Sequence, residues 1–234
     1  MKIAIMQPYF FPYIGYFQLL NAVDKFVVYD NIQYTKKGWI NRNRILLNKK
    51  VEYFTLPLKK DSDYLNIVER ELSTDWQQEN KKILNKIKLN YSKAPYFEQT
   101  FELTKRCFDF HEKNLFQFIL FSITQIMDYL EIKTKLINSS EIDINHDLKS
   151  ENKVIEICKK INCNNYLNPI GGVNLYDKNN FKNQSIDLQF LKSNEIQYKQ
   201  FNIEFQSNLS IIDLMMFNSK EQIINFLNKE YKLV

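Results

Sequence analysis

Short runs typical of β-strands alternate with segments of helical spacing along this chain, and this alternation most constrains its fold. Near the start, KIAIM (2–6) and DKFVVYD (24–30) are β-rich, and the apolar residues between Ile14 and Val23 recur on one face of a helix. Such a strand, helix, strand unit joins parallel strands. We therefore predict an α/β fold with a Rossmann-like parallel sheet and flanking helices, of which the nucleotidyltransferase-like (HUP) arrangement is one variant.

The remaining pattern continues this alternation within one domain, 1–234, with a helical insert at about 75–131. A third strand, VEYFTLPLK, ends near Pro57, and a helix follows from about Asp75, with Thr74 and Gln77 at capping-box spacing. Two aromatic helices between 96 and 131 are expected to pack into the core. Strands are predicted at 133–140, 164–169 and 187–193, an extended segment at 196–201, and helices at 151–161, from Ser210 and from Ser219.

Composition indicates a soluble globular protein, with 44% hydrophobic and 25% charged residues. No apolar run approaches the roughly 20 residues of a membrane-spanning helix. The first residues contain one lysine and lack a small-residue cleavage site, so they indicate a strand and not a signal peptide. We expect a cytoplasmic protein with no membrane insertion.

Cysteine, histidine and charge patterns exclude several classes of site. The three cysteines and two histidines are scattered, which supports neither a disulfide framework nor a zinc site, so no metal site is predicted. The net charge of +5 comes from lysines interleaved with acids on helix faces, and DNA is not an expected partner. A modest positive field favours an anionic small substrate such as a nucleotide sugar.

The first candidate site is the turn QPYFFPYIGYFQ (7–18), between the first strand and the first helix. The chain has four glycines, and such a sparing use indicates positions where backbone conformation or close approach requires glycine. Helix N-terminal amides above a parallel sheet hold phosphate. A tight, aromatic-packed turn is the alternative. The candidate ligand-binding residues here are Gln7, Tyr9, Gly15 and Tyr16.

The second candidate site follows the second strand, in YDNIQYTKKGWINRNRI (29–45). Amides and guanidinium groups at a strand end suit hydroxyls and phosphates, and a plain surface loop would not need Trp39. The candidate residues are Asp30, Asn31, Gln33, Lys36, Asn41, Arg42, Asn43 and Arg44.

Two later segments add further candidates. NYLNPIGGVNLYD (165–177) frames a turn that approaches a ligand closely or is a simple β-turn. In SNLSIIDLMMF (207–217), a serine and an acid have the spacing of a helix N-cap and its first-turn carboxylate. The candidate binding residues of the first of these segments are Asn168, Gly171, Gly172 and Tyr176.

Four segments in this order resemble the WbqC-like family over essentially the whole chain. The resemblance implies a protein that is encoded beside the genes for O-antigen, lipopolysaccharide and other bacterial surface polysaccharides, often together with amino-sugar enzymes. The segments are IMQPYFFPYIGYFQLL (5–20), VDKFVVYDNIQYTKKGWINRNRI (23–45), YLNPIGGVNLYD (166–177) and YKQFNIEFQSNLSIIDLMMFN (198–218).

The first turn is also similar in placement to the H-x-G-H turn of adenylate-forming enzymes, with Tyr13, Gly15 and Tyr16 at the matching positions. Tyrosine donates a hydrogen bond but supplies no cation near neutral pH. Arg42, Arg44 and Lys36 are candidates for the missing charge. Pantothenate synthetase-like enzymes with such a turn join a carboxylate to an amine.

These patterns lead to one hypothesis: an acyl or aminoacyl group, such as glycyl, is attached to the amine of a nucleotide-linked deoxyamino sugar. Asp30 is the candidate general base, with Tyr16 and Arg42 also catalytic, although an aspartate that caps a turn explains Asp30 equally well. The cofactor is unknown. The donor is activated with ATP and Mg²⁺, or arrives on an aminoacyl-tRNA or a thioester.

Two other functions stay open at this level. A non-catalytic nucleotide-sugar-binding protein of the same pathway is compatible with the absence of a Cys/His, Ser/His or metal-binding constellation. A nucleotidyltransferase is less favoured, because the chain lacks a Gly-rich pyrophosphate loop.

Overall fold

The computed structural model describes all residues from 1 to 234 and contains a sheet of six strands in the order β5-β2-β1-β6-β7-β8. Neighbouring strands are parallel except β8, which runs antiparallel to β7. The predicted α/β fold with a Rossmann-like parallel sheet is confirmed, whereas β8 was not predicted. The strands are β1 (Lys2–Met6), β2 (Lys25–Val28), β5 (Lys135–Asn138), β6 (Asn165–Pro169), β7 (Asp187–Ser193) and β8 (Tyr231–Leu233).

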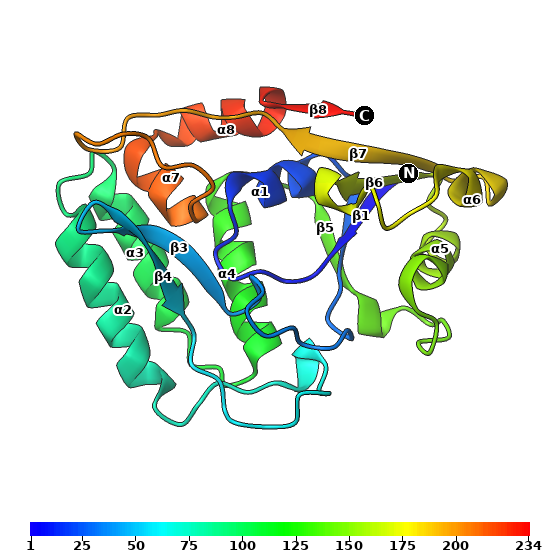
Figure 1. The fold of residues 1–234 in the computed structure, drawn as a ribbon, viewed down its shortest axis with the longest axis horizontal. Helices are drawn as coiled ribbons and strands as arrows, with labels where there is room; N and C mark the ends of the chain where they lie inside the picture. Colours follow the sequence, from blue (N-terminus) through cyan, green and yellow to red (C-terminus); the bar gives the residue numbers. More distant parts are fainter.

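Helices cover both faces of the sheet (Figure 1). On one face α1 packs against α8, and on the other α5 and α6 contribute to a second hydrophobic cluster. The short α6 was not predicted. The helices are α1 (Ile14–Asn21), α2 (Trp76–Tyr91), α3 (Phe97–Phe108), α4 (Leu115–Tyr129), α5 (Ser150–Lys160), α6 (Lys178–Asn183), α7 (Ile211–Phe217) and α8 (Lys220–Lys229), with 3-10 turns η1 (Ile67–Glu69), η2 (Ser139–Glu141) and η3 (Ile170–Gly172).

The sequence of strand β1 is mostly apolar and shows no clear alternation of apolar and polar residues, and the position of the strand explains why. Ile3 and Ile5 belong to the cluster that includes α5, while Ala4 belongs to the cluster on the α1 face. A strand in the middle of a parallel sheet is buried on both faces and therefore carries a continuous apolar run. The pattern positions β1 at the centre of the sheet, where its carboxyl end meets the loops of β2 and β6.

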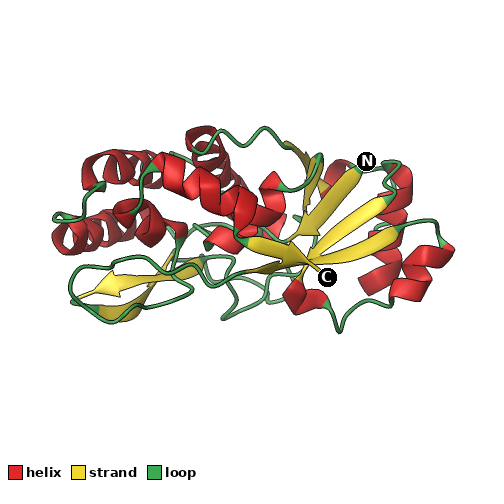
Figure 2. Ribbon diagram, turned by 90° about the horizontal axis from the view of Figure 1, so that it is seen from above, coloured by secondary structure: helices red, strands yellow, loops and turns green.

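The predicted third strand does not join this sheet. Strands β3 (Arg42–Leu47) and β4 (Lys50–Thr55) form a separate antiparallel hairpin. The interpretation of residues 29–45 as one loop was therefore wrong for its last part. Figure 2 shows the hairpin beside the helices and apart from the fan of parallel strands.

Helices α2, α3 and α4 follow one another between β4 and β5, and their aromatic residues pack into the core as expected. Phe108, Phe116 and Phe118 are each at most 1% exposed. The predicted capping box is absent: Asp75 is the N-cap of α2 and makes no side-chain cap hydrogen bond. The N-cap predicted at Ser210 is confirmed, and Ser219, predicted as the start of the last helix, is the N-cap of α8. None of the helices combines the length and hydrophobicity that crossing a lipid bilayer requires.

Candidate functional site

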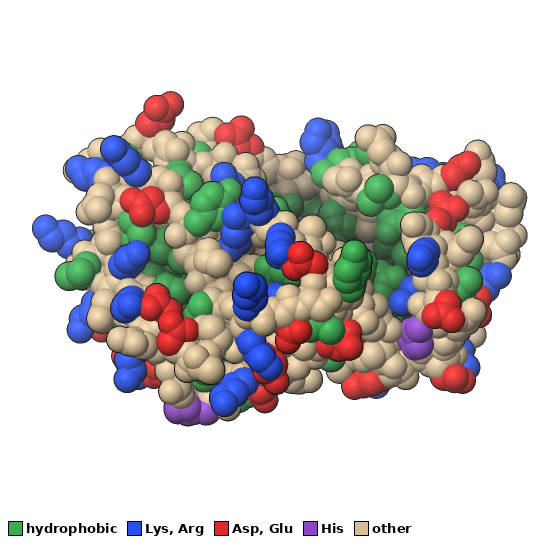
Figure 3. Space-filling model, turned by 60° about the horizontal axis from the view of Figure 1, so that its bottom comes forward, with side chains coloured by type: hydrophobic (Ala, Val, Ile, Leu, Met, Phe, Trp, Pro, Cys, Tyr) green, Lys and Arg blue, Asp and Glu red, His purple; other side chains and the backbone are tan.

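Along the chain, strands are added first on one side of β1 and later on its other side, next to β6. From β1 the chain adds β2 and β5 on one side, while β6 and β7 lie on the other. In open parallel sheets, ligands bind beyond the carboxyl ends of the strands at such a switch point. Figure 3 shows a hollow with apolar side chains on its floor, between the part with helices α2 to α4 and the part with α5 and α6.

The first motif sends two phenylalanines into the core, which explains part of its aromatic content. Phe10 and Phe11 are fully buried, and the Phe11 ring stacks on Phe108. The φ of Phe11 is 43°, a left-handed value that residues with a side chain rarely adopt. The side-chain amide of Asn43 donates to both phenylalanine carbonyls. The Ser210 hydroxyl also donates to the Phe11 carbonyl, at 2.8 Å, and these bonds hold the turn in its strained conformation.

Of the tyrosines in this turn, Tyr9 is partly buried and Tyr13 is 38% exposed. A Cβ atom on Gly15 would lie 2.3 Å from the Tyr13 hydroxyl, so the phenol ring lies directly against this glycine. No glycine in the chain has a positive φ, and close approach is therefore the property that Gly15 supplies. The first turn of α1 is covered here by a ring, which does not suit the phosphate site expected at this helix end.

Tyr16 is 4% exposed, and its hydroxyl donates to the Gln7 carbonyl at 3.2 Å. Its ring contacts Phe26 in the core and Tyr9 toward the surface. This placement gives Tyr16 a packing role and does not suit the catalytic role that the sequence suggested. The Gln7 side chain is partly buried, and its backbone is part of the same turn.

A cavity of about 270 Å³ brings three of the motifs together. Arg44 is its cation: the guanidinium carbon lies 5.3 Å from the centre of the Trp39 ring, and Nη2 donates to the Asn208 carbonyl at 2.8 Å. Its Nε is buried and has no hydrogen-bond partner. An unpaired buried donor on a cationic side chain suits an anionic ligand, which would satisfy it. The cavity is lined by Tyr9, Pro12, Tyr13, Trp39, Asn43, Arg44 and Asn208.

A second cavity, of about 320 Å³, adjoins the first and shares Tyr13 and Asn208 with it. Ile170 of the third motif and several residues of the fourth line this cavity. Residues from all four motifs therefore line two adjoining cavities at the carboxyl end of the sheet.

The acid of the fourth motif has a structural role. Asp213 is fully buried and accepts hydrogen bonds from the Tyr91 and Tyr198 hydroxyls and from the Gln200 amide. Burial raises the pKa of Asp213, and the three donors oppose this shift. The network fastens the segment before α7 to α2, and so fixes one wall of the second cavity.

Several candidates from the second motif lie elsewhere. Lys36 pairs with Asp63 at 2.7 Å, and Gln33 donates to the carbonyl of the same residue. Asn41 is buried between Tyr34 and the Leu56 carbonyl.

Arg42, which the sequence suggested as catalytic, donates to the carbonyls of Lys37 and Gly38 and lies 4.6 Å from the Tyr53 ring centre. It stabilises the preceding turn and does not line the cavity around Arg44.

Asp30 is fully buried, and both of its carboxylate oxygens accept hydrogen bonds. Its donors are the Ser139 hydroxyl and the backbone and side chain of Ser140, which follow β5. A buried carboxylate with donors on both oxygens does not suit the general base role. Asn31 Oδ1 lies 2.6 Å from the same Ser139 hydroxyl, whose single proton is shared between the two acceptors, and the Asn31 amide nitrogen contacts His146 Nδ1 at 2.8 Å. This network joins the ends of β2 and β5.

The third motif is built by close packing. A Cβ on Gly172 would lie 1.9 Å from the Asn168 side-chain nitrogen, whereas one on Gly171 would meet nothing within 4 Å. Asn168 is 5% exposed and accepts from the Tyr166 hydroxyl at 3.0 Å. Tyr176 packs edge-on against Tyr166 at 6.0 Å between ring centres. Asn168 and Gly172 thus shape the turn, and Tyr176 is held near the strand ends.

Sequence reasoning missed Asn208 of the cavity wall and a buried lysine, Lys153, on α5. A signal for the lysine exists, because Lys153 stands four residues before Ile157 and beside Val154, on the apolar face of its helix. A lysine in phase with that face is either paired or functional.

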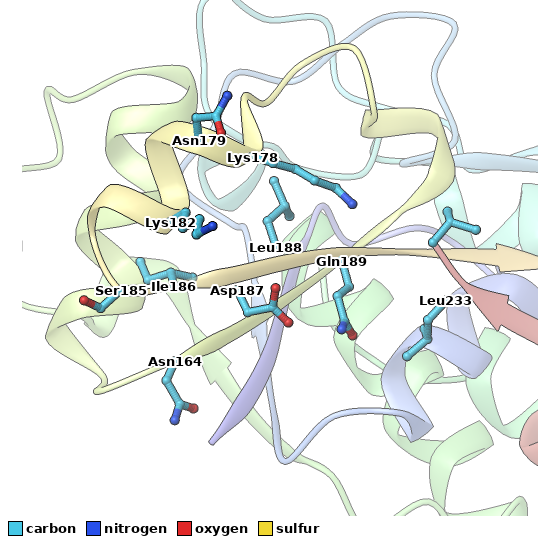
Figure 4. A pocket seen from close by; sticks show the side chains of 11 residues that line it. Asn164, Lys178, Asn179, Lys182, Ser185, Ile186, Asp187, Leu188, Gln189 and Leu233 are labelled. Atoms are coloured by element: carbon cyan, nitrogen blue, oxygen red, sulfur yellow. The ribbon is translucent and has the colours of Figure 1, made fainter.

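A larger cavity, of about 590 Å³, lies at the edge of the sheet between α6, β7 and the chain end (Figure 4). Lys178 and Lys182 line it, but no predicted site residue does. No group of three His, Cys, Asp or Glu side chains is arranged to hold a metal ion. The two cavities at the motifs are therefore the candidate site.

Comparison with known proteins agrees with the four motifs. The model of the WbqC-like protein family matches residues 7–225. The chain is 29% identical over 218 residues to the uncharacterized protein Rv1507c of Mycobacterium tuberculosis, with 92% of each chain covered. No solved structure matches this chain. Because the family match extends over nearly the whole length, including all four motifs that surround the cavities, the chain belongs to the WbqC-like protein family.

Proposed function

We propose that this protein is a transferase of bacterial surface-polysaccharide synthesis, which attaches an acyl or aminoacyl group such as glycyl to the amine of a nucleotide-linked deoxyamino sugar. The observation that carries the proposal is the convergence of the four family motifs on two adjoining cavities around Arg44 and Tyr13. Their volumes, about 320 and 270 Å³, together suit a ligand of nucleotide-sugar size.

Arg44 is the residue that we assign to the diphosphate of this ligand. Its Nε has no partner in the protein, and a guanidinium group forms charge-assisted, bidentate bonds with phosphate oxygens. Trp39, Tyr9 and Tyr13 present aromatic surface on which a base or a sugar ring stacks.

The proposed reaction is direct attack on an activated donor. The cavity around Arg44 contains no Cys, His, Asp or Glu side chain that would form or activate a covalent intermediate. The sugar nitrogen, as the free amine, attacks the acyl carbonyl carbon and forms the amide bond. The bond from that carbon to its leaving oxygen or sulfur breaks, the leaving group keeps the electron pair, and the amine proton passes to solvent.

Tyr9 and Tyr13 are suited to stabilise the oxyanion that develops on the acyl carbonyl. Burial raises the pKa of both phenols, and Tyr13 adds to the increase at Tyr9, so both remain protonated hydrogen-bond donors at neutral pH. An acyl-adenylate formed from ATP and Mg²⁺, an aminoacyl-tRNA and a thioester all satisfy this scheme as donors.

The test compares Arg44→Gln with Arg42→Gln in binding to UDP- and dTDP-linked amino sugars. The two changes remove the same charge from neighbouring positions of β3, but only Arg44 lines the cavity. We expect about tenfold or greater loss of affinity for Arg44→Gln, because a hydrogen bond to a charged group contributes roughly 1.5–3 kcal/mol. Arg42→Gln should retain the affinity.

Product formation is then followed by mass spectrometry, with the sugar and each class of donor. A mass increase equal to one acyl group, lost in Arg44→Gln, supports the transferase. Binding without turnover for every donor would make the protein a nucleotide-sugar-binding component, and the absence of nucleotide-sugar binding would refute the proposal.

A further inference from the structure

On the opposite face of the sheet from α1, a lysine is buried without a carboxylate partner. Lys153 of α5 is 5% exposed, and its ammonium group donates one hydrogen bond, to the His146 carbonyl at 3.2 Å. The same nitrogen lies 5.2 Å from the centre of the Tyr29 ring. No carboxylate oxygen lies within 4.0 Å of it, since none of the salt bridges includes this residue. An ammonium group has three donors, and two of these lack an acceptor.

Two phenols accompany this lysine at the strand ends. Tyr29 follows β2, and Tyr176 follows β6, on the two sides of the central strand β1. Burial raises the pKa of Tyr29 to about 12, and the nearby Tyr176 contributes to the increase. Burial also raises the pKa of Tyr176, and a hydrogen bond with Tyr166 opposes this shift, so both hydroxyls are protonated at neutral pH.

The position of Tyr176 is fixed by the helix that carries the lysine. Glu151, in the first turn of α5, accepts from the backbone N–H of Asp177 at 2.7 Å and from the side-chain amide of Asn180 at 2.7 Å. Tyr176 also packs edge-on against Phe181. The lysine and the phenol therefore belong to one preorganised unit.

Asp30, the carboxylate with the larger electrostatic effect on Lys153, already accepts hydrogen bonds from other residues. Burial lowers the pKa of Lys153, and the Asp30 and Asp147 carboxylates oppose this shift. The Asp30 oxygens accept from Ser139 and Ser140, so they do not occupy the free donors of the lysine. A buried cation with two unused donors is thus left beside the Tyr29 ring, and such a group suits an anionic ligand.

We propose that Lys153, Tyr29 and Tyr176 bind the phosphate of the activated acyl donor, at a subsite separate from the one that Arg44 provides for the nucleotide sugar. This inference rests on the proposed function, because a transferase of this kind needs a second substrate. An acyl-adenylate and the terminal adenosine of an aminoacyl-tRNA both present a phosphate ester of adenosine. Both subsites lie at the carboxyl end of the sheet.

Calorimetric titration with pyrophosphate and with AMP tests the subsite. Lys153→Gln is compared with Lys159→Gln, which removes the same charge from an exposed position of the same helix. We expect Lys153→Gln to weaken binding of either probe by about tenfold or more, as for the loss of a charge-assisted bond, and Lys159→Gln to change it less than about twofold. Preference for AMP over pyrophosphate would identify an adenosine phosphate as the natural ligand, and the reverse preference would identify a free phosphate group.

Two further variants keep the test decisive if Lys153→Gln does not fold. Lys153→Arg retains the charge and should retain most of the affinity, and Tyr29→Phe removes one donor and should weaken binding by roughly threefold to tenfold. The proposal is refuted if the wild-type protein binds neither probe at millimolar concentration, or if the lysine variants lose affinity equally.

The two hypotheses fail in different ways. If Arg44→Gln abolishes nucleotide-sugar binding while Lys153→Gln leaves pyrophosphate binding intact, the subsite is wrong and the transferase proposal stands. If pyrophosphate binding depends on Lys153 but no nucleotide sugar binds, the proposed function fails, and with it the identification of the phosphate as that of an acyl donor.

Discussion

Adjacent glycines in the third motif should respond in opposite directions to the same substitution. In Gly172→Ala, the new Cβ would lie 1.9 Å from the Asn168 side-chain nitrogen and 3.1 Å from its Cγ, so the amide must move. In Gly171→Ala the methyl group meets nothing within 4 Å, and neither glycine has a positive φ. The local backbone therefore tolerates alanine at both positions, and only the space differs.

The magnitude follows from what Asn168 holds. Its displacement leaves the hydroxyl of the fully buried Tyr166 without an acceptor, which costs about 1–3 kcal/mol. Overpacking of the turn adds roughly 1–3 kcal/mol. We expect Gly172→Ala to lower the free energy of unfolding by about 2–6 kcal/mol. Gly171→Ala should raise it by roughly 0.4–1 kcal/mol, because alanine restricts the unfolded chain.

Urea denaturation, followed by circular dichroism, measures both free energies of unfolding. A double-mutant cycle adds a stricter control: in an Asn168→Ala background the methyl group of Gly172→Ala has room, and its cost should fall below about 1 kcal/mol. Equal effects of the two glycine substitutions, or an unchanged cost in the Asn168→Ala background, would refute this reasoning.

Three further predictions concern the buried polar and strained residues. Asp213→Ala leaves the donors of Tyr91, Tyr198 and Gln200 unsatisfied and should lower the free energy of unfolding by about 3–5 kcal/mol in urea denaturation; a loss below about 1 kcal/mol would contradict the role of this network. Because burial raises the pKa of Asp213, the folded state binds the proton more tightly than the unfolded state, and this carboxyl lowers stability as pH rises from the unfolded pKa to the folded one. Unfolding measured from pH 3 to 7 should show this contribution in the wild-type protein and not in Asp213→Asn; parallel profiles would argue against it. Phe11→Ala should lose about 3–5 kcal/mol of core packing, but Phe11→Gly should be no less stable than Phe11→Ala, since the φ of 43° penalises alanine by roughly 1–2 kcal/mol; thermal unfolding that restores the usual order of alanine above glycine would disprove the strain.

The spacing of apolar residues correctly predicted those strands and helices that have a clear apolar face or an apolar run. Strand β1 and helices α1 to α5 lie within a few residues of their predicted positions, and the serine cap of α7 was predicted correctly from a short motif. Helix α6 and strand β8 have six and three residues, too few for a period to be visible.

Buried polar residues account for the main errors. Strand β3 begins Arg42, Asn43, Arg44, which resembles a polar loop, yet Asn43 faces inward to bind the carbonyls of the Phe10–Phe11 turn. Lys153 was counted, for the same reason, among the lysines that alternate with acids on helix faces. Local pattern reasoning places polar side chains outside, and only tertiary structure shows which of them have a buried partner.

The same limit applies to the candidate site. Tyr9, Asn43 and Arg44 meet in one cavity, but Lys36 and Gln33, from the same stretch of sequence, turn toward Asp63. Side chains that are close in sequence therefore point in different directions. No rule based on residue spacing predicts the direction of each one.

The link between the first turn and the end of the chain has a consequence for biosynthesis. The Phe11 carbonyl accepts from Ser210, and the Pro12 carbonyl from the backbone N–H of Ile211, so the turn is completed by residues about two hundred positions later. Gln18 of α1 likewise donates to carbonyls of Phe226 and Glu230. Ribosomes synthesise the amino-terminal turn first, and its partners follow about two hundred residues later. The nascent chain therefore carries an incomplete turn until the segment from Ser210 to Glu230 has been synthesised.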